Sequence, residues 1–178
     1  APTKVGVGIA DVMCGMYATV GMLAALRHAE QTGTGQHIDL SRVDSQMAWL
    51  INEGTNYLTS QQLPQRRGNT HPNIVPYGVF PTRDGHVILA VGNDTQFRAF
   101  CSVFHRPDLK NDPRFETNPL RVDNRVALDA AVVETFRTFD SAQILEMLQS
   151  VKVPAGPIHS VAQALGSDQA KAREAIIR

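Results

Sequence analysis

The chain has 178 residues, of which 43% are hydrophobic and 19% charged, an ordinary composition for one medium-sized globular domain or two small ones. Its 17 basic and 17 acidic residues leave no net charge, which argues against a nucleic-acid-binding protein. Cys14 and Cys101 are far apart and indicate buried, reduced thiols rather than a disulfide framework. We find no signal peptide and no apolar run of membrane-spanning length, because Arg27 and Glu30 close the longest one. The sequence therefore predicts a cytoplasmic protein that binds neither nucleic acid nor a membrane.

The first predicted helix, residues 12–31, is rich in small and apolar side chains, and Asp11 stands directly before it. A lone Asp at a helix start is a favoured N-cap, because its oxygen accepts hydrogen bonds from unpaired backbone N–H groups of the first turn. The same position suits a reactive carboxylate, since the helix dipole stabilises the anion that a nucleophile requires. The residues alone leave both interpretations open.

Glycines end this helix at Gly33-Thr34-Gly35, and the alternation in residues 36–40 predicts a short strand. Ser41 is then expected to cap a second helix over residues 42–58. We assign residues 1–58 to the first domain.

Residues 59–76 form a long polar connection with three prolines and no periodicity, which we interpret as a linker between domains. Arg66, Arg67, His71 and Asn73 could contact a ligand here. Ordinary solvated linker residues would look the same.

The remaining residues, 77–178, predict a small α+β domain. An Asp-Gly turn predicts a hairpin, and apolar periodicity predicts helices after it. The expected elements are strands at 77–81 and 86–91, a helix at 95–104 capped by Asp94, a helix at 122–139, a helix capped by Ser141, a strand at 158–159 and helix from 160 onward. The six histidines lack metal-ligand spacing, and phosphate-binding, dinucleotide-binding and hydrolase motifs are absent, so we expect no metal site.

Several short motifs recur in a fixed order along the chain. They are Ile9-Ala10-Asp11, Gly15, GMLAAL at 21–26, TGTGQHID at 32–39, RGNTHPN at 67–73, YGVF at 77–80, Asp84-Gly85, VGND at 91–94, DPRF at 112–115 and VPAGP at 153–157. In this order and spacing the chain resembles the family III CoA-transferases, the CaiB–BaiF family, which includes formyl-CoA and carnitine CoA-transferases.

The resemblance implies an α/β fold of which this chain holds the catalytic helix, the linker and the small domain. It places Asp11 at the family's catalytic aspartate, which attacks an acyl-CoA and then carries CoA as an aspartyl thioester. It implies acyl-CoA and carboxylic acid substrates, no tightly bound cofactor, and an interlocked homodimer. Family members are about twice this length, so we expect the isolated piece to lack a complete CoA site and to be inactive.

The resemblance also makes the linker, residues 59–76, an active-site loop. In formyl-CoA transferase a glycine-rich loop closes over the intermediate, and here the matching stretch offers Gly68, Asn69, His71 and Asn73 as substrate-binding residues. The glycine run is missing, which implies a different acyl or acceptor group.

Two other functions stay open at this stage. One is α-methylacyl-CoA racemisation in the same family, with the aspartate as acid or base and a partner histidine upstream of Ala1. The other is an inactive fragment or a non-catalytic binding module.

Overall fold

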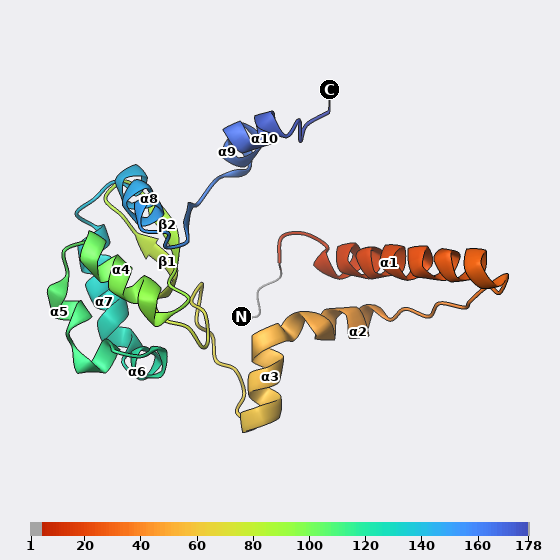
Figure 1. The fold of residues 1–178 in the computed structure, drawn as a ribbon, viewed down its shortest axis with the longest axis horizontal. Coiled ribbons are helices and arrows are strands. Elements are labelled where there is room, and N and C mark those ends of the chain that lie inside the picture. The colour runs from red at the N-terminus through yellow and green to blue at the C-terminus, as the bar shows by residue number, and fades with distance from the viewer. Residues whose placement is uncertain (1–4, 178) are drawn as a thin grey trace. The chain divides into compact units, whose positions relative to one another are not determined.

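A computed structural model describes residues 5–177, which form two compact units, one up to Gln65 and one from Arg66 onward (Figure 1). The first unit is helical and the second holds a three-stranded sheet with helices, so the predicted mixed α/β class is confirmed. The first unit contains α1 (Ile9–Thr32), α2 (Arg42–Met47), the 3₁₀ helix η1 (Ala48–Leu50) and α3 (Ile51–Ser60). The second contains β1 (Tyr77–Pro81), β2 (His86–Ala90), α4 (Asp94–Val103), α5 (Pro107–Lys110), η2 (Pro113–Phe115), α6 (Asn118–Asp123), α7 (Arg125–Phe136), α8 (Ser141–Ser150), β3 (Ala155–Pro157), α9 (Val161–Leu165) and α10 (Asp168–Ala172).

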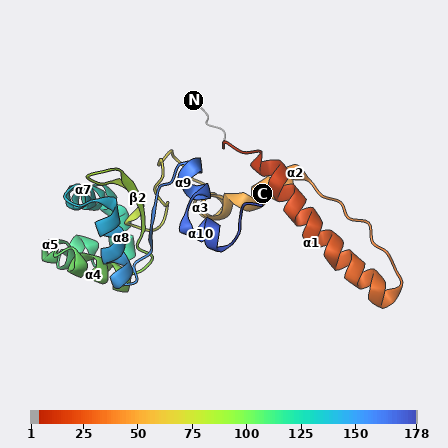
Figure 2. The ribbon, with the colours of Figure 1, turned by 90° about the horizontal axis from the view of Figure 1, so that it is seen from above.

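In the first unit α1 ends as predicted, at Gly33, whose positive φ of 70° lets its N–H bond to the Ala29 carbonyl at 2.8 Å. The chain then runs back beside α1 (Figures 1 and 2). The predicted strand at 36–40 is wrong: this segment is extended but pairs with no strand among residues 5–65. It packs instead on the helix, where Ile38 faces Gly21.

Ser41 caps α2 as predicted, accepting a hydrogen bond from the Asp44 backbone N–H at 3.2 Å. The single helix expected over 42–58 is wrong, because it is interrupted by η1 and by Ile51, which has a φ of 42°. Periodicity alone does not reveal such a break, since the apolar spacing continues through it.

Helix α1 corrects one further expectation. With 24 residues it is long and apolar enough to cross a membrane by length and composition, because Arg27 and Glu30 lie near its end. A core helix of a soluble protein and a signal sequence pass the same test. Several of its large apolar residues are more than half exposed in this chain, as at Val12, Val20 and Leu23.

The second unit is built on an antiparallel sheet of order β1-β2-β3, in which Val79 pairs with Ile88 and Ile88 with Gly156. The predicted Asp-Gly hairpin is confirmed. Helices α4, α7 and α8 complete the unit around one apolar core. That core comprises Val75, Phe80, Val87, Leu89, Val91, Phe97, Phe100, Cys101, Phe104, Leu109, Phe115, Leu128, Val132, Phe136, Ile144, Leu148 and Val153.

Several boundaries in this unit differ from the predictions by a few residues. Asn93 and Asp140, one position before the expected Asp94 and Ser141, are the N-caps of α4 and α8. The helix expected over 122–139 is divided at Asn124 and ends at Phe136. The strand expected at 158–159 lies at 155–157 instead, where hydrogen bonding to β2 fixes its position. Pairing partners cannot be read from a three-residue run.

Arg121 is the largest fully buried side chain of the described residues, and it connects α6 to α4 and to the residues before β1. Its guanidinium pairs with Asp94 at 2.7 Å, donates to the Val75 carbonyl at 2.8 Å, and lies over the Phe97 ring at 4.6 Å. A buried cation is tolerated only when its donors are satisfied in this way.

A second tie joins the hairpin turn to α8. The Asp84 carboxylate accepts hydrogen bonds from the Ser141 backbone N–H at 2.8 Å and hydroxyl at 2.7 Å, and from the Thr82 hydroxyl at 3.0 Å. The bonds from Ser141, then that from Thr82, lower the pKa of Asp84 to about 2.

We predict that Arg121→Met lowers the free energy of unfolding by about 3 kcal/mol, because it removes a buried cation and strands the Val75 and Phe115 carbonyls that accept from it. Urea denaturation followed by circular dichroism measures this. The exposed Arg98 of α4 gives the control Arg98→Met, which should stay within about 0.5 kcal/mol of wild type. Equal losses in the two variants would contradict the assigned role of Arg121.

The lowered pKa of Asp84 makes a separate prediction about acid stability. A depressed folded-state pKa stabilises the fold above the unfolded value near 3.8, and this contribution disappears as the pH falls toward 2. Asp84→Asn should therefore be less stable than wild type at pH 5, and the difference should shrink between pH 4 and about 2. Denaturant midpoints across this range test it, with the exposed Asp123→Asn as control. A constant difference would refute the assignment.

Candidate active site

Asp11 is the third residue of α1 and does not cap it. Gly8 occupies the N-cap position, and no side chain makes a capping hydrogen bond there. The helix begins at Ile9, three residues before the predicted start at Val12, and the N-cap interpretation of Asp11 does not hold. The Asp11 carboxylate is 66% exposed and available for another role.

The group that meets this carboxylate is Arg42, the first residue of α2. Its Nη1 atom lies 3.2 Å from Asp11 Oδ1, and its side chain is 73% exposed. Ile9 and Met13 near the start of α1 line a cavity of only 40 Å³ together with Gln46 of α2 and Trp49 of η1, so the segment after Arg42 also packs on the start of α1. The sequence interpretation did not include Arg42.

The lengths of the helix and of the chain after it place Arg42 beside Asp11. From Asp11 to Thr32 an α-helix rises about 32 Å. An extended chain covers about 33 Å over the ten residue steps from Thr32 to Arg42. A straight return along the helix therefore brings residue 42 level with residue 11, as the structure has it.

The second group of predicted site residues lies in the other unit, on the loop before β1. Gly68 adopts a positive φ of 62°, and the Thr70 hydroxyl donates to the Arg67 carbonyl at 2.8 Å, which shapes a turn. The His71 ring stacks on Tyr77 with centroids 4.9 Å apart. Its Nδ1 accepts from the Asn73 backbone N–H at 3.1 Å, so the neutral ring carries its proton on Nε2.

Helices α6 and α7 hold this loop through its backbone. Arg125 donates to the carbonyls of His71 at 2.7 Å and Pro72 at 3.0 Å. Asn118 donates to the Asn73 carbonyl at 2.8 Å and accepts from the Val75 N–H at 3.2 Å. The loop thus presents the His71 and Asn73 side chains from a backbone fixed at its carbonyls.

The Arg125 anchor is electrostatically unusual. Its Nη1 and the Asp129 Oδ1 are buried without a hydrogen-bond partner in the described chain. Burial lowers the pKa of Arg125 and raises that of Asp129, and the attraction between the two opposes each shift in part.

Within the first unit, then, the structure brings Asp11 to Arg42, and within the second it gathers Gly68, Asn69, His71 and Asn73 on one loop.

Among residues 5–177, no three His, Cys, Asp or Glu side chains gather as metal ligands would. Cys101 is buried, which raises the pKa of its thiol to about 12.

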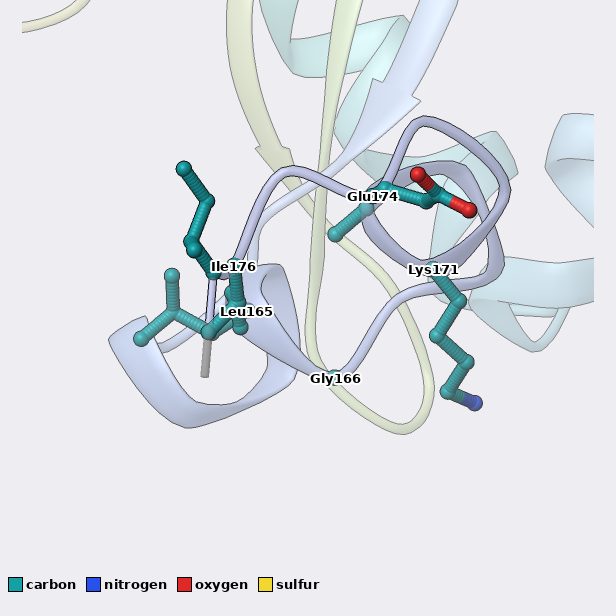
Figure 3. A pocket seen from close by; sticks show the side chains of 7 residues that line it. Leu165, Gly166, Lys171, Glu174 and Ile176 are labelled. Atoms are coloured by element: carbon teal, nitrogen blue, oxygen red, sulfur yellow. The ribbon is translucent and has the colours of Figure 1, made fainter.

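Another hollow lies away from these residues. It has a volume of 630 Å³ and is formed by α9, α10 and the residues that follow (Figure 3). Leu165 and Ile176 line one side, with Glu174 and Lys171 opposite. Its lining is mainly apolar and includes no predicted site residue, so we assign it no ligand.

The chain is similar to known proteins over its whole length. The sequence profile of CoA-transferase family III matches residues 1–178. A succinate–glutarate CoA-transferase of Agrobacterium fabrum is 42% identical over 97% of this chain and 43% of its own length. An acetyl-CoA:oxalate CoA-transferase of Acetobacter aceti is 35% identical over 99% of this chain and 46% of its own. The crystal structure of a CaiB/BaiF family protein from Brucella suis matches with a TM-score of 0.72 and 41% identity, covering 97% of this chain and 46% of that one. The chain thus spans less than half the length of these relatives.

We predict that Arg125→Gln loosens the loop before β1, because the shorter side chain cannot reach the His71 and Pro72 carbonyls. Loss of two charge-assisted hydrogen bonds should speed hydrogen exchange of the His71 amide, which bonds to the Tyr77 carbonyl, by at least about tenfold. Mass spectrometry of peptides covering residues 68–78 measures it. Arg98→Gln serves as the exposed control, and unchanged exchange in Arg125→Gln would mean that the loop is held by other contacts.

Proposed function

Since the chain belongs to CoA-transferase family III, we propose that it takes part in the transfer of CoA from an acyl-CoA to a carboxylic acid, with Asp11 as covalent nucleophile. The observation that carries this proposal is the Asp11 carboxylate itself. It is exposed, has no capping role, and lies in the first turn of a 24-residue helix whose dipole favours negative charge there. The relatives are named for this reaction class with small dicarboxylic acids, which we take as first candidates for donor and acceptor.

The proposed exchange balances in four steps. An Asp11 oxygen attacks the acyl carbon, the C–S bond breaks, and CoA leaves as thiolate, giving a mixed anhydride. The thiolate attacks the Asp11 carbonyl carbon and releases the donor acid as its carboxylate. The acceptor carboxylate then attacks the aspartyl-CoA thioester and expels the thiolate. Finally the thiolate takes the acyl group of the acceptor and restores the Asp11 carboxylate.

The loop of the second unit supports a substrate-binding role. Its fixed backbone presents Asn69, His71 and Asn73, whose side chains can donate hydrogen bonds to an oxyanion. We propose these residues and Gly68 as substrate contacts.

The other properties inferred from the resemblance stay predictions. These are the cytoplasmic location, the lack of a tightly bound cofactor, the inactivity of this chain alone and the homodimer. The exposed apolar side chains of α1 support the presence of another polypeptide surface packed on this unit. Large exposed apolar patches mark such contact sites.

We predict that Asp11→Ala, in the protein expressed from its complete gene, lowers turnover at least about a thousandfold, as loss of a covalent nucleophile does. Incubation with succinyl-CoA or acetyl-CoA, then hydroxylamine, should leave a hydroxamate on Asp11 in wild type, detected by peptide mass spectrometry. The matched control is Asp44→Ala. Asp44 is also the third residue of a helix and exposed, yet pairs with no cation in the described residues, so activity should persist.

Each alternative gives a different result. Absence of the hydroxamate, together with α-proton exchange of a branched acyl-CoA in heavy water, would indicate the racemase. Full activity in Asp11→Ala would refute Asp11 as the catalytic group. Neither CoA transfer nor α-proton exchange in wild type would leave the non-catalytic binding module.

A further inference from the structure

We propose that Arg42 binds the carboxylate that leaves or attacks at Asp11, exchanging its own ion-pair partner at each half of the reaction. The proposal rests on Asp11 as the nucleophile and adds a binding residue to it. In the part of the first unit that the structure describes, Arg42 is the cation beside Asp11. Among residues 5–65 the other Lys or Arg is Arg27, about 24 Å away along α1.

One negative charge stays beside Asp11 throughout the proposed reaction. Free Asp11 carries one negative charge next to Arg42. When Asp11 becomes an anhydride the charge moves to the CoA thiolate, and when it becomes a thioester the charge resides on the departing or arriving carboxylate. One anion therefore stands beside the Asp11 carbonyl at every stage, and one guanidinium can neutralise each in turn.

Arg42 lies close enough to Asp11 to contact the carboxylate that attacks it. The attacking carboxylate oxygen must come within about 3.5 Å of the Asp11 carbonyl carbon. Arg42 Nη1 already lies 3.2 Å from an Asp11 oxygen, so the same group can contact that carboxylate. A guanidinium carries five N–H donors in a planar fork that matches a carboxylate, and its closest contact with Asp11 is made by Nη1.

Arg42 can exchange its ion-pair partner. Both side chains are more than 60% exposed, and an ion pair of this kind is weak and easily replaced. The backbone that carries Arg42 is held nevertheless, because Ser41 caps α2, and because Gln46 and Trp49 after it share a small cavity with Ile9 and Met13 of α1. A fixed backbone with a reachable guanidinium suits a group that changes partners.

The test uses Arg42→Gln and Arg42→Lys in the protein expressed from its complete gene, with succinyl-CoA as donor and glutarate as acceptor. Hydroxylamine trapping with succinyl-CoA alone reports the first half-reaction, and steady-state kinetics give kcat/KM for each substrate. Arg27→Gln is the matched control, since Arg27 is 71% exposed and pairs with Glu30 at the far end of α1.

Arg42→Gln should still form the Asp11 adduct with succinyl-CoA, while kcat/KM for glutarate falls at least about tenfold. Arg42→Lys should recover part of that loss, and Arg27→Gln should match wild type. An unchanged kcat/KM for glutarate, or a loss confined to succinyl-CoA, would overturn the role of Arg42. Failure of wild type to form the adduct would instead remove the premise, and the proposal with it.

Discussion

The extended return of residues 34–41 along α1 is the constraint on which the candidate site depends. A helix and an extended chain of matched length bring two residues 31 positions apart into an ion pair at one end of the first unit. The Gly33 turn makes the reversal possible, and the contact of Ile38 with Gly21 keeps the two segments adjacent. The chemistry proposed for Asp11 therefore depends on a segment that contains no reactive group of its own.

The second unit solves a different problem, that of holding an irregular loop in place. Polar side chains of α6 and α7 replace the backbone partners that a strand would have supplied. Two of them are arginines, one fully buried, whose long stems pack while their donors reach carbonyl oxygens. For the substrate-binding role proposed for this loop, rigid placement reduces the entropy that binding must overcome.

The sequence was informative where a local rule determines structure. The Gly33 helix end, the Ser41 cap and the Asp84-Gly85 hairpin depend on neighbouring residues, and all were predicted. The start of α1 was missed because Gly8 caps without a side chain, so the pattern pointed to Asp11 instead. Arg42 and the loop anchors were missed because they depend on contacts distant in sequence. Asp11 was predicted as a site residue from the motif around it. Only the structure shows that its side chain does not cap the helix.

The uneven distribution of the core affects what a calorimeter would detect. The heat-capacity change of unfolding is proportional to the apolar surface that becomes exposed, and the core residues lie between Val75 and Val153. Among residues 5–65 only Ser45 is buried. A thermal scan of this chain would therefore record the melting of the second unit alone. The first unit buries too little apolar surface to give a cooperative transition of its own, so the melting temperature would carry no information about substitutions at Asp11 or Arg42.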